Sequence, residues 1–395
     1  MSSLADALTG LAAGSDSRTV NAPESFRPHY DLDESRGGVI VSKPRTLADA
    51  PDIADVFGDW NLDSSQWRIV SVRRSQWQRY DGEYLTAARV TVVPLDSAAE
   101  VRSDAELPNI LASLDKWKPT RAKVTTGELA YVVNVGDTQY GKDAGGGTEA
   151  AVERILSAYS ESVARLHSLR RSGKSIGTVV LPQLGDCIEG TTSQAGKVRG
   201  QSDLSLTGQI RLGRRMLLAL VKAYAPLADR VIVPVVPGNH DETYRDLLTK
   251  PIDSWQVEVV SQVQDICTES GKFDHVEWRY PDEDSAQLAV DVNGTMLAFA
   301  HGHQMPSRDV AKWWGGQATG RTPVGAADVL ITGHFHHFRA EQIGPRLWIQ
   351  VPSMDGGSPW FVNRTGLESP PGLVTLVVGA GYDPRTDLGI VGGVR

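Results

Sequence analysis

The chain has 395 residues, of which 41% are hydrophobic and 22% are charged, and its formal net charge is −8. This length can hold one large α/β domain and a smaller one, and the composition is that of an ordinary globular protein. The negative net charge excludes a general attraction to nucleic acid or to anionic membranes, although bound divalent cations would add positive charge locally.

Cysteine content and hydropathy indicate the cellular compartment in which the protein is expected. The chain has two cysteines, Cys187 and Cys267, which argues against a disulfide framework and fits a reducing cytosol. Acidic Asp6 stands near the N-terminus, where a signal peptide would have basic and then apolar residues. No apolar run reaches the ~18 residues needed to span a bilayer. We therefore expect a cytoplasmic protein without membrane contact.

The first third of the chain divides into two predicted parts. Residues 1–45 are rich in Ser, Ala, Gly and Asp without sustained periodicity, so we expect a flexible N-terminal segment. Residues 46–125 form a small α+β accessory domain in this interpretation. Its β-hairpin joins two β-branched runs, 67–72 and 88–93, through an Asp-Gly turn, and a short helix follows at 107–117.

From residue 126 to 395 the pattern changes to alternating strands and helices, which predicts a larger domain. Strands are expected at 129–135, 177–184, 230–236, 295–300, 328–332 and 347–351. One amphipathic helix has apolar residues at a spacing of three to four from Val152 to Leu166, with Leu156 among them. Another helix runs from Leu206 and ends before Pro226. The alternation predicts an open α/β sheet with helices on both faces.

Metal-ligating residue types follow the first five of these strands. The motifs are Gly136-Asp-Thr-Gln139, Gly185-Asp-Cys-Ile-Glu189, Gly238-Asn-His-Asp241, His301-Gly-His303 and Gly333-His-Phe-His336. Because the carboxyl ends of strands form the ligand crevice of an open α/β sheet, these side chains should meet at one edge. Each motif alone has an ordinary explanation as a turn or a surface histidine. Six of the nine histidines lie in or beside the last three motifs, however, which favours a common site.

Together the five motifs resemble the calcineurin-like metallophosphoesterase superfamily, whose pattern runs Asp-x-His, Gly-Asp-x-x-Asp/Glu, Gly-Asn-His-Asp/Glu, His and Gly-His-x-His. The resemblance covers residues from about 129 to 338, with trailing strands to about 380. It implies a two-sheet β-sandwich flanked by helices, which refines the single sheet expected from the pattern alone. It also implies a phosphoesterase (EC 3.1) that depends on two divalent metal ions.

The resemblance assigns a role to each matching position. Six residues are implied to be metal ligands: Asp137 and His336 at the first metal, Asn239, His301 and His334 at the second, and Asp186 as the bridge between them. His240 matches the family's catalytic histidine beside the leaving-group oxygen. His303 and His337 are not ligands in the family pattern, so a supporting or structural role is expected for them.

One position departs from the family pattern. Gln139 stands where the family has a histidine, and an amide oxygen is a poorer ligand than imidazole for borderline metals. Gln139 is expected either to coordinate through its carbonyl oxygen or to leave that place to water. The phage-encoded branch of the family resembles this chain in having Asp-x-Gln, so the change indicates a subtype related to phage and DNA-repair nucleases. The mixed nitrogen and oxygen set suits Mn²⁺ first, with Fe or Zn²⁺ as alternatives.

Three groups of residues favour DNA as the substrate. Arg73 and Arg74 lie in the N-terminal hairpin among tryptophan and tyrosine residues, a mixture that can track a single strand. Lys197 and Arg199 follow the second motif, and Trp313 and Trp314 lie in a predicted loop after His301. Arginines on an edge hairpin are usually solvated, and paired tryptophans are usually in a core, so each group also has a structural explanation.

The function expected first is therefore a DNA exonuclease or endonuclease in the cytoplasm of a bacterium or of a phage-infected host. One alternative is a phosphodiesterase or phosphatase that acts on a nucleotide or a phosphoprotein. Another, from a different class, is an inactive metal-binding interaction module. The oligomeric state stays open, with a homodimer as one option, and the preference for DNA rests partly on analogy with the family.

Overall fold

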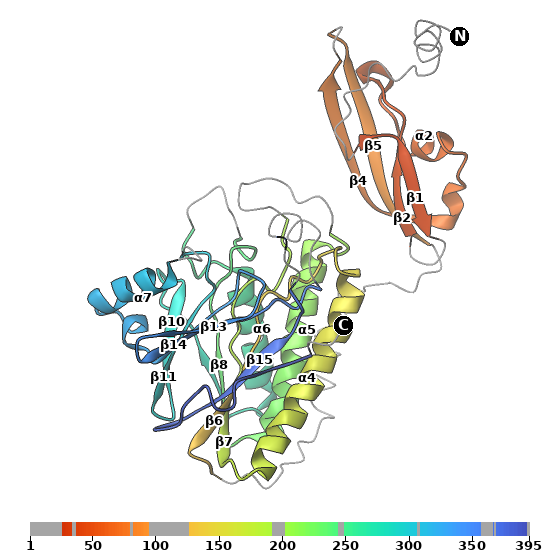
Figure 1. Cartoon of the computed structure of the whole chain (residues 1–395). Coiled ribbons are helices and arrows are strands. Elements are labelled where there is room, and N and C mark those ends of the chain that lie inside the picture. Colours follow the sequence, from red (N-terminus) through yellow and green to blue (C-terminus); the bar gives the residue numbers. More distant parts are fainter. Residues whose placement is uncertain are drawn as a thin grey trace, which may run out of the picture. The chain divides into compact units, whose positions relative to one another are not determined.

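The computed structural model describes residues 26–33, 37–79, 82–94, 126–191, 202–243, 249–305, 309–356, 366 and 369–392. The chain divides into two compact units, Met1–Ser103 and Asp104–Arg395. Figure 1 shows the helices and strands of each unit. In the described part of the chain, no helix is both long enough and apolar enough to cross a membrane.

In its described residues, the N-terminal unit is an antiparallel sheet packed against a short helix. Its strands are β1 (His29–Asp33), β2 (Gly37–Val41), β3 (Arg45–Thr46), β4 (Trp67–Gln78) and β5 (Tyr84–Pro94). The order is β1-β2-β5-β3, and β4 also pairs with β5, so the predicted hairpin is confirmed. Helix α2 (Ile53–Gly58) packs its Phe57 against Ile40 and Val90 of the sheet. Short 3-10 turns occupy Leu47–Asp49 and Ser64–Gln66.

The prediction that residues 1–45 form a flexible segment is wrong for the last third of that range. Strands β1 and β2 lie there, and both belong to the sheet of the N-terminal unit. The sequence of β1, His-Tyr-Asp-Leu-Asp, alternates only two apolar residues with polar ones, which is too short a pattern to stand out. The boundary predicted near residue 125 and the helix predicted at 107–117 concern residues 95–125, which lie outside the described residues.

The larger unit contains two mixed sheets. In the first, β6 (Leu129–Asn134), β7 (Ile176–Val180), β8 (Arg230–Pro234) and β9 (Val276–Arg279) are parallel, and β15 (Leu373–Val378) and β16 (Gly389–Val391) add antiparallel strands beside β6. In the second, β11 (Thr295–Ala300), β12 (Val329–Thr332) and β14 (Arg346–Gln350) are parallel, and β10 (Gln287–Val292) and β13 (Arg339–Ile343) form antiparallel edges.

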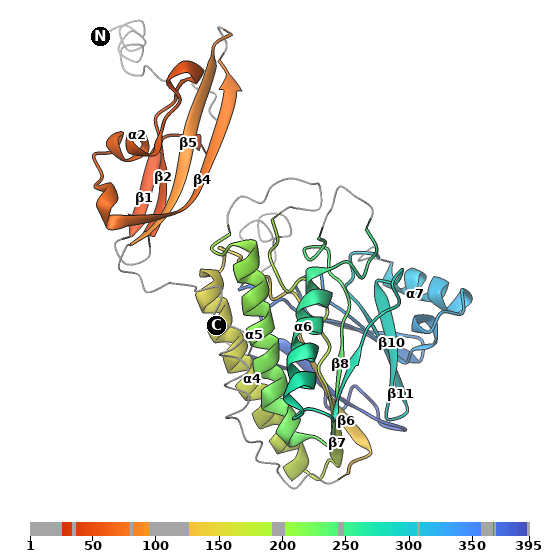
Figure 2. The same cartoon turned by 180° about the vertical axis from the view of Figure 1, so that it is seen from behind.

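The two sheets pack face to face, and helices cover their outer faces. Helices α4 (Gly147–Arg171), α5 (Leu206–Tyr224) and α6 (Trp255–Ser270) lie side by side on the six-stranded sheet (Figures 1 and 2). Helix α7 (Val310–Thr319) packs on the five-stranded sheet. A 3-10 turn at Ala225–Leu227 follows α5, and another at Val324–Ala326 precedes β12.

Successive residues of the central strands enter different cores. In β6, Tyr131 and Val133 face the three helices, whereas Ala130 and Val132 face the other sheet. The period of two along a strand therefore buries both faces and produces the continuous apolar runs seen in the sequence. Phe299 of β11 joins the core between the sheets from the opposite side.

All six strands and both helices predicted for residues 126–395 are present, with ends shifted by a few residues. The single open sheet inferred from the pattern alone is not, because three of the six strands belong to each sheet. Strands buried on both faces look alike whether a helix or a second sheet covers them, so hydropathy could not separate the two arrangements. The two-sheet sandwich flanked by helices, implied by the family resemblance, is confirmed.

Helix α4 shows how far the apolar pattern defines burial. Leu166 is fully buried between the helix and the sheet, as predicted. Leu156 was predicted on the same apolar face, but it is 45% exposed. Its neighbour Ile155, which the pattern also placed on that face, is fully buried.

We expect Leu166→Ala to lower the free energy of unfolding of the larger unit by about 2–5 kcal/mol, because it leaves a cavity in a close-packed core. Leu156→Ala removes the same atoms from the same helix and should cost about 0.5 kcal/mol or less. Equilibrium urea unfolding, followed by fluorescence in the presence of a chelator, measures both. Similar losses in the two variants would contradict the packing described for α4.

Candidate metal centre

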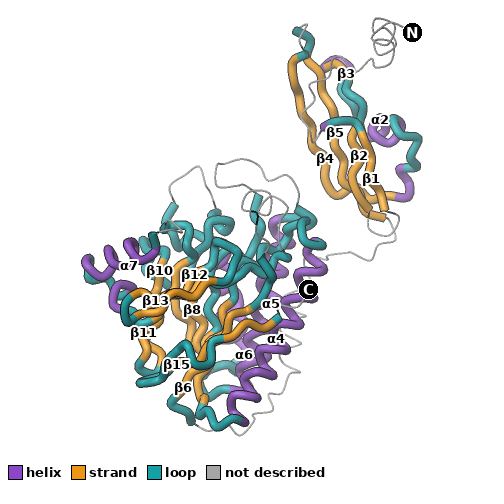
Figure 3. The backbone as a smooth tube through the Cα atoms, in the orientation of Figure 1, coloured by secondary structure: helices purple, strands orange, loops and turns teal. Residues whose placement is uncertain are grey.

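The predicted ligands lie in loops that follow the parallel strands of both sheets. Figure 3 shows the strands in orange and the connecting loops in teal. The oxygen donors all follow strands of the six-stranded sheet: Asp137 and Gln139 after β6, Asp186 after β7 and Asn239 after β8. The nitrogen donors all follow strands of the five-stranded sheet: His301 after β11, and His334 and His336 after β12. The site therefore forms at the seam between the two sheets, with one class of ligand from each.

Backbone hydrogen bonds hold the first two motif loops together. The N–H groups of Asp137 and Gln139 donate to the carbonyl oxygens of Gly185 and Asp186, at 3.1 and 3.0 Å. Further along, the N–H of Tyr140 donates to the carbonyl of Cys187 at 2.9 Å. The loops after β6 and β7 thus continue the parallel pairing beyond the strands, which fixes where their side chains emerge.

Each buried carboxylate is oriented by a backbone N–H from a different ligand loop. The N–H of His334 donates to Oδ2 of Asp137 at 2.9 Å, and the N–H of His240 donates to Oδ1 of Asp186 at 2.7 Å. The second oxygen of each carboxylate, Oδ1 of Asp137 and Oδ2 of Asp186, is buried and accepts no hydrogen bond. Both carboxylates therefore present one bare oxygen to the interior of the site.

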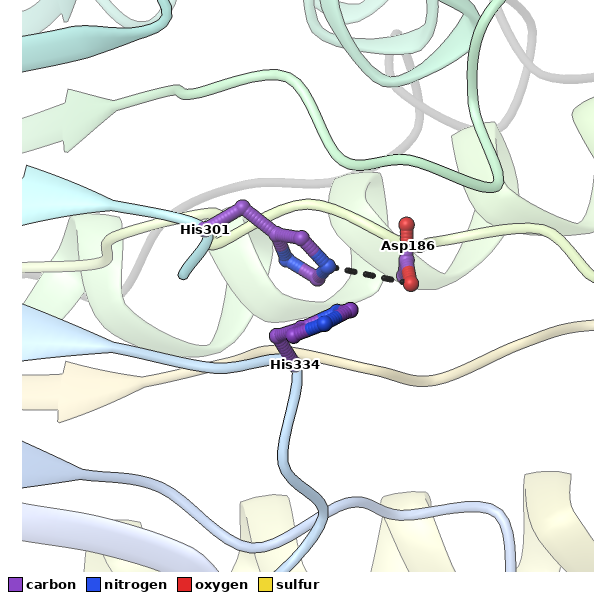
Figure 4. A group of neighbouring side chains, drawn as sticks. All are labelled: Asp186, His301 and His334. Atoms are coloured by element: carbon purple, nitrogen blue, oxygen red, sulfur yellow. Dashed lines mark ion pairs between the residues drawn. The ribbon is translucent and has the colours of Figure 1, made fainter. Parts of the chain in front are cut away.

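His301 lies at the centre of the predicted second metal position. Its Nε2 is 3.1 Å from Oδ2 of Asp186 and 3.1 Å from Oδ1 of Asn239. Its Nδ1 lies 2.7 Å from the carbonyl oxygen of Leu184 and donates its hydrogen there, which leaves the Nε2 lone pair for a cation. Figure 4 shows the ring directed at Asp186, with the His334 ring beside it. Asp186, His301 and His334 offer ligand atoms that all lie within 4.8 Å of one another.

His336 forms the core of the predicted first metal position. Its Nε2 lies 3.2 Å from the bare Oδ1 of Asp137. Its Nδ1 lies 3.3 Å from Oδ2 of Asp355, a buried carboxylate that the sequence interpretation did not include. A carboxylate behind a ligating imidazole is a common support for a metal site, because it fixes the ring orientation and raises the basicity of the ligand.

These distances fit the presence of cations. Two ligand atoms that are each about 2.1 Å from a cation lie roughly 3.0–3.4 Å apart at ordinary coordination angles. The bare carboxylate oxygens lie 3.1 and 3.2 Å from imidazole nitrogens, which is within that range. A buried carboxylate oxygen without a donor is costly unless a positive charge compensates it. The donor set fits divalent cations by both geometry and charge.

The pKa values of the histidines also indicate that the site favours positive charge. Burial alone would lower the pKa of His301, but the carboxylate of Asp186 outweighs it and raises that pKa to about 9. Burial is likewise outweighed at His336, where Asp137 and Asp355 raise the pKa to about 10. Burial and His301 lower the pKa of His334 to about 4. The carboxylates thus favour positive charge at two ring positions, and a bound cation would take the place of those protons.

Backbone strain is concentrated at this site. Of the eight non-glycine residues with positive φ in the described part of the chain, five are predicted ligands: Asp137 (50°), Gln139 (42°), Asp186 (55°), His334 (71°) and His336 (57°). Positive φ is uncommon outside glycine, and strained residues of this kind cluster at functional sites. The strain turns the side chains inward, towards the position that the cations would occupy.

Two glycines permit the close approach of the loops. A Cβ on Gly238 would lie 2.2 Å from Oδ1 of Asp186, and a Cβ on Gly333 would lie 2.5 Å from Oδ2 of Asp137. Asp241 completes the packing here, because its carboxylate accepts from the N–H groups of Asp186 and Gly238. The Gly-Asn-His-Asp motif therefore supplies a predicted ligand, a histidine and a carboxylate that joins two loops of the site.

His240 lies beside the predicted ligands rather than among them. Its side chain is 12% exposed, with Nε2 3.8 Å from Oδ2 of Asp186 and Nδ1 3.6 Å from Oε2 of Glu189. The side-chain amide of Gln139 contacts the same ring. This placement keeps one imidazole next to the cation positions and within reach of solvent.

Sequence reasoning missed Lys142 and Asp355. The Lys142 ammonium pairs with the Asp355 carboxylate and also donates to Oε1 of Gln139 at 3.0 Å. Asp355 comes five residues after the end of β14, so it arrives at the same edge as the predicted ligands. The signal for Asp355 in the sequence was its place four residues after the predicted strand 347–351. Lys142 gave none, because a lysine in a polar loop is ordinary.

The structure places the residues predicted to bind substrate in different environments. Arg73 and Arg74 are exposed on β4 in the N-terminal unit. Lys197 and Arg199 lie outside the described residues. Trp313 and Trp314 lie on α7 and not in a loop, and only Trp313 is partly exposed. Trp314 is 1% exposed and donates its ring N–H to the carbonyl of Val324, so it is a core residue and we exclude it from substrate binding.

Comparison with known proteins yields no family model and no curated protein that matches this chain. Solved structures do match over part of it. A zinc complex of wild-type Vps29 from Entamoeba histolytica is 16% identical and covers 62% of this chain and 84% of its own, with a TM-score of 0.29. A structure described as a novel archaeal phosphodiesterase is 14% identical and covers 66% of this chain and 99% of its own, with a TM-score of 0.31.

A conserved uncharacterized protein from Streptococcus pneumoniae, described as a predicted phosphoesterase, is also similar. It is 13% identical and covers 63% of this chain and 83% of its own, with a TM-score of 0.27. Similarity at this level does not define an activity for the present chain. The assignment of function therefore depends on the residues at the seam between the two sheets.

Proposed function

We propose that this chain is a phosphodiester hydrolase that uses two divalent cations, most favourably Mn²⁺. The observation that carries the proposal is the pair of buried carboxylates, Asp137 and Asp186. Each presents a bare oxygen 3.1–3.2 Å from an imidazole nitrogen, at strand ends where His240 also lies. The resemblance of the five motifs to the calcineurin-like metallophosphoesterases supports the same chemistry.

The cations would supply a nucleophile at neutral pH and neutralise charge on the phosphoryl oxygens. The protein's own residues hold and orient the reacting groups. Asp137 and His336 would bind one cation, Asn239, His301 and His334 the other, and Asp186 both. His240 would deliver a proton to the departing oxygen, since its partly exposed ring lies beside Asp186.

DNA is the substrate class that we propose within this chemistry. Arg73 and Arg74 are exposed cationic side chains on β4, and the Arg74 guanidinium also donates to the carbonyl oxygen of Pro51. Trp313 is a partly exposed aromatic side chain on α7, suited to stacking on a base. Hydrolysis within a polymer of phosphodiesters would make the chain a nuclease and DNA its binding partner.

The first test concerns the cations. Asp186→Asn keeps an oxygen that can accept from the N–H of His240 but removes the negative charge, so the Mn²⁺ content should fall at both positions. Metal analysis after equilibration with Mn²⁺ should find up to two ions per chain in the unmodified protein and fewer than one in the variant. Asp265→Ala, an exposed change on α6, is the control. Full metal content in Asp186→Asn would refute the bridging assignment.

The second test separates binding from proton transfer at adjacent residues. Asn239→Ala should lower metal occupancy and turnover together, and excess Mn²⁺ should restore part of the rate. His240→Ala should keep its metal but lose on the order of 10²–10⁴-fold in kcat, as expected for a positioned general acid. That loss should shrink on a nitrophenyl diester, because nitrophenolate departs without a proton.

Steady-state kinetics on DNA and on the nitrophenyl diester, together with metal analysis, measure both effects. His167→Ala, on the outer helix α4, is the control for removal of an imidazole. The general-acid role would be wrong if His240→Ala were equally impaired on both substrates, or if it lost metal as Asn239→Ala does.

The third test concerns the substrate. With Mn²⁺, the protein should cleave labelled DNA faster than a generic phosphodiester, and a phosphodiester faster than a phosphomonoester. Replacing Arg73 and Arg74 by Ala should weaken DNA binding and reduce its salt dependence, by roughly 0.7–0.9 in the log–log slope for each phosphate that the protein no longer neutralises. Hydrolysis of the nitrophenyl diester should not change.

The matched control is the pair Arg171→Ala and Arg215→Ala, which removes the same charge from exposed positions on α4 and α5. Rapid monoester hydrolysis without DNA cleavage would place the protein among phosphatases. An equal loss on DNA and on the small diester would make the arginines structural.

A further inference from the structure

The side chain of Gln139 is held between Lys142 and His240. Gln139 is buried, and its backbone N–H donates to the Asp186 carbonyl. The ammonium of Lys142 lies 3.0 Å from Oε1 of the Gln139 amide. The amide nitrogen lies 3.0 and 3.3 Å from the two ring nitrogens of His240. The amide thus connects the loop after β6 to the predicted catalytic histidine.

Lys142 determines which way this amide points. An ammonium group has only donors, so the amide atom that faces it must be the oxygen. The NH₂ group must then face His240. The oxygen that a cation would need is consequently directed at a side chain that already carries positive charge.

Asp355 keeps Lys142 in this place. Its buried carboxylate pairs with the ammonium on one side and lies 3.3 Å from Nδ1 of His336 on the other. The Lys142 side chain is only 15% exposed. The Asp355 carboxylate therefore fixes two side chains. One is His336, a predicted ligand of the first cation, and the other is Lys142, which donates to the amide oxygen of Gln139.

We propose that Lys142 keeps Gln139 out of the coordination sphere of the first cation and turns the amide toward His240. Gln139 is then a positioning residue for the catalytic histidine. Asp137, His336 and the shared Asp186 are the protein ligands of that cation. The positioning role rests on the proposed function, whereas the statement about coordination concerns cation binding alone.

Calorimetric titration of the metal-depleted protein with Mn²⁺ tests the coordination. Gln139→Ala should change each Mn²⁺ affinity by less than threefold, because no ligand is lost. Asp137→Asn removes the negative charge of a ligand and should lower an affinity by tenfold or more. A loss of threefold or more in Gln139→Ala would overturn the inference.

A double-mutant cycle tests whether Lys142 holds the Gln139 amide away from the cation. Lys142→Met frees the amide oxygen and removes a nearby positive charge, so Mn²⁺ affinity should rise by at least threefold. Adding Gln139→Ala in that background should reverse most of the gain, although the same change is silent when Lys142 is present. Additive effects of the two substitutions would overturn the proposal.

Lys174→Met is the matched control for the change of charge. Lys174 also pairs with an aspartate, Asp387, but it lies next to the start of β7, at the other end of the sheet. Its replacement should leave Mn²⁺ affinity within threefold of the original value. If Lys174→Met raised the Mn²⁺ affinity as much as Lys142→Met does, the change in net charge alone would explain the effect. That result would overturn the proposed role of Lys142.

Kinetics test the positioning role separately. Gln139→Ala should lower kcat on DNA by about tenfold with KM unchanged, and should lower it less on the nitrophenyl diester, because it acts through the proton donor. An equal loss on both substrates would overturn the positioning role. If the unmodified protein hydrolysed no phosphodiester, the proposed function would fail, while the Mn²⁺ cycle would still decide whether Gln139 is a ligand.

Discussion

The orientation of two buried carboxylates is the constraint on which the rest of the site depends. Asp137 receives an N–H from the loop after β12, and Asp186 receives one from the loop after β8. Because the first of these hydrogen bonds crosses from one sheet to the other, the carboxylates are placed correctly only when the sandwich is packed. The apolar layer between the sheets, with Val132 and Phe299 at its centre, therefore determines the geometry of the polar edge.

This arrangement carries a cost that the fold must offset. Five ligand positions have positive φ, and strain of this kind costs roughly 1–3 kcal/mol at a residue. The bare oxygens of Asp137 and Asp186 add the cost of burying charge. The continuous cores on both sides of the six-stranded sheet supply the compensating stability. Such an unfavourable combination at one edge of a sheet is typical of a site selected for binding or catalysis.

Much of this could be predicted from the sequence, and the failures have physical reasons. The candidate ligands were identifiable because each comes shortly after an apolar strand, as His301 comes directly after β11. The division into two sheets was not, since a strand buried on both faces has the same pattern in either arrangement. Lys142 and Asp355 were missed because their importance lies in a contact between residues 213 positions apart. The burial of Trp314 depends on packing in the same way.

The separation of donor types between the sheets has a consequence for synthesis of the chain. The oxygen ligands, from Asp137 to Asn239, leave the ribosome before any of the nitrogen ligands, from His301 to His336. An incomplete chain therefore carries hard carboxylate and amide donors without imidazoles, a set that favours Mg²⁺ or Ca²⁺ over borderline metals. In the proposed function, the imidazoles that a borderline metal such as Zn²⁺ prefers would join these donors only when the second sheet has been made and has closed against the first. The choice of cation proposed for this site would thus be made at the end of folding.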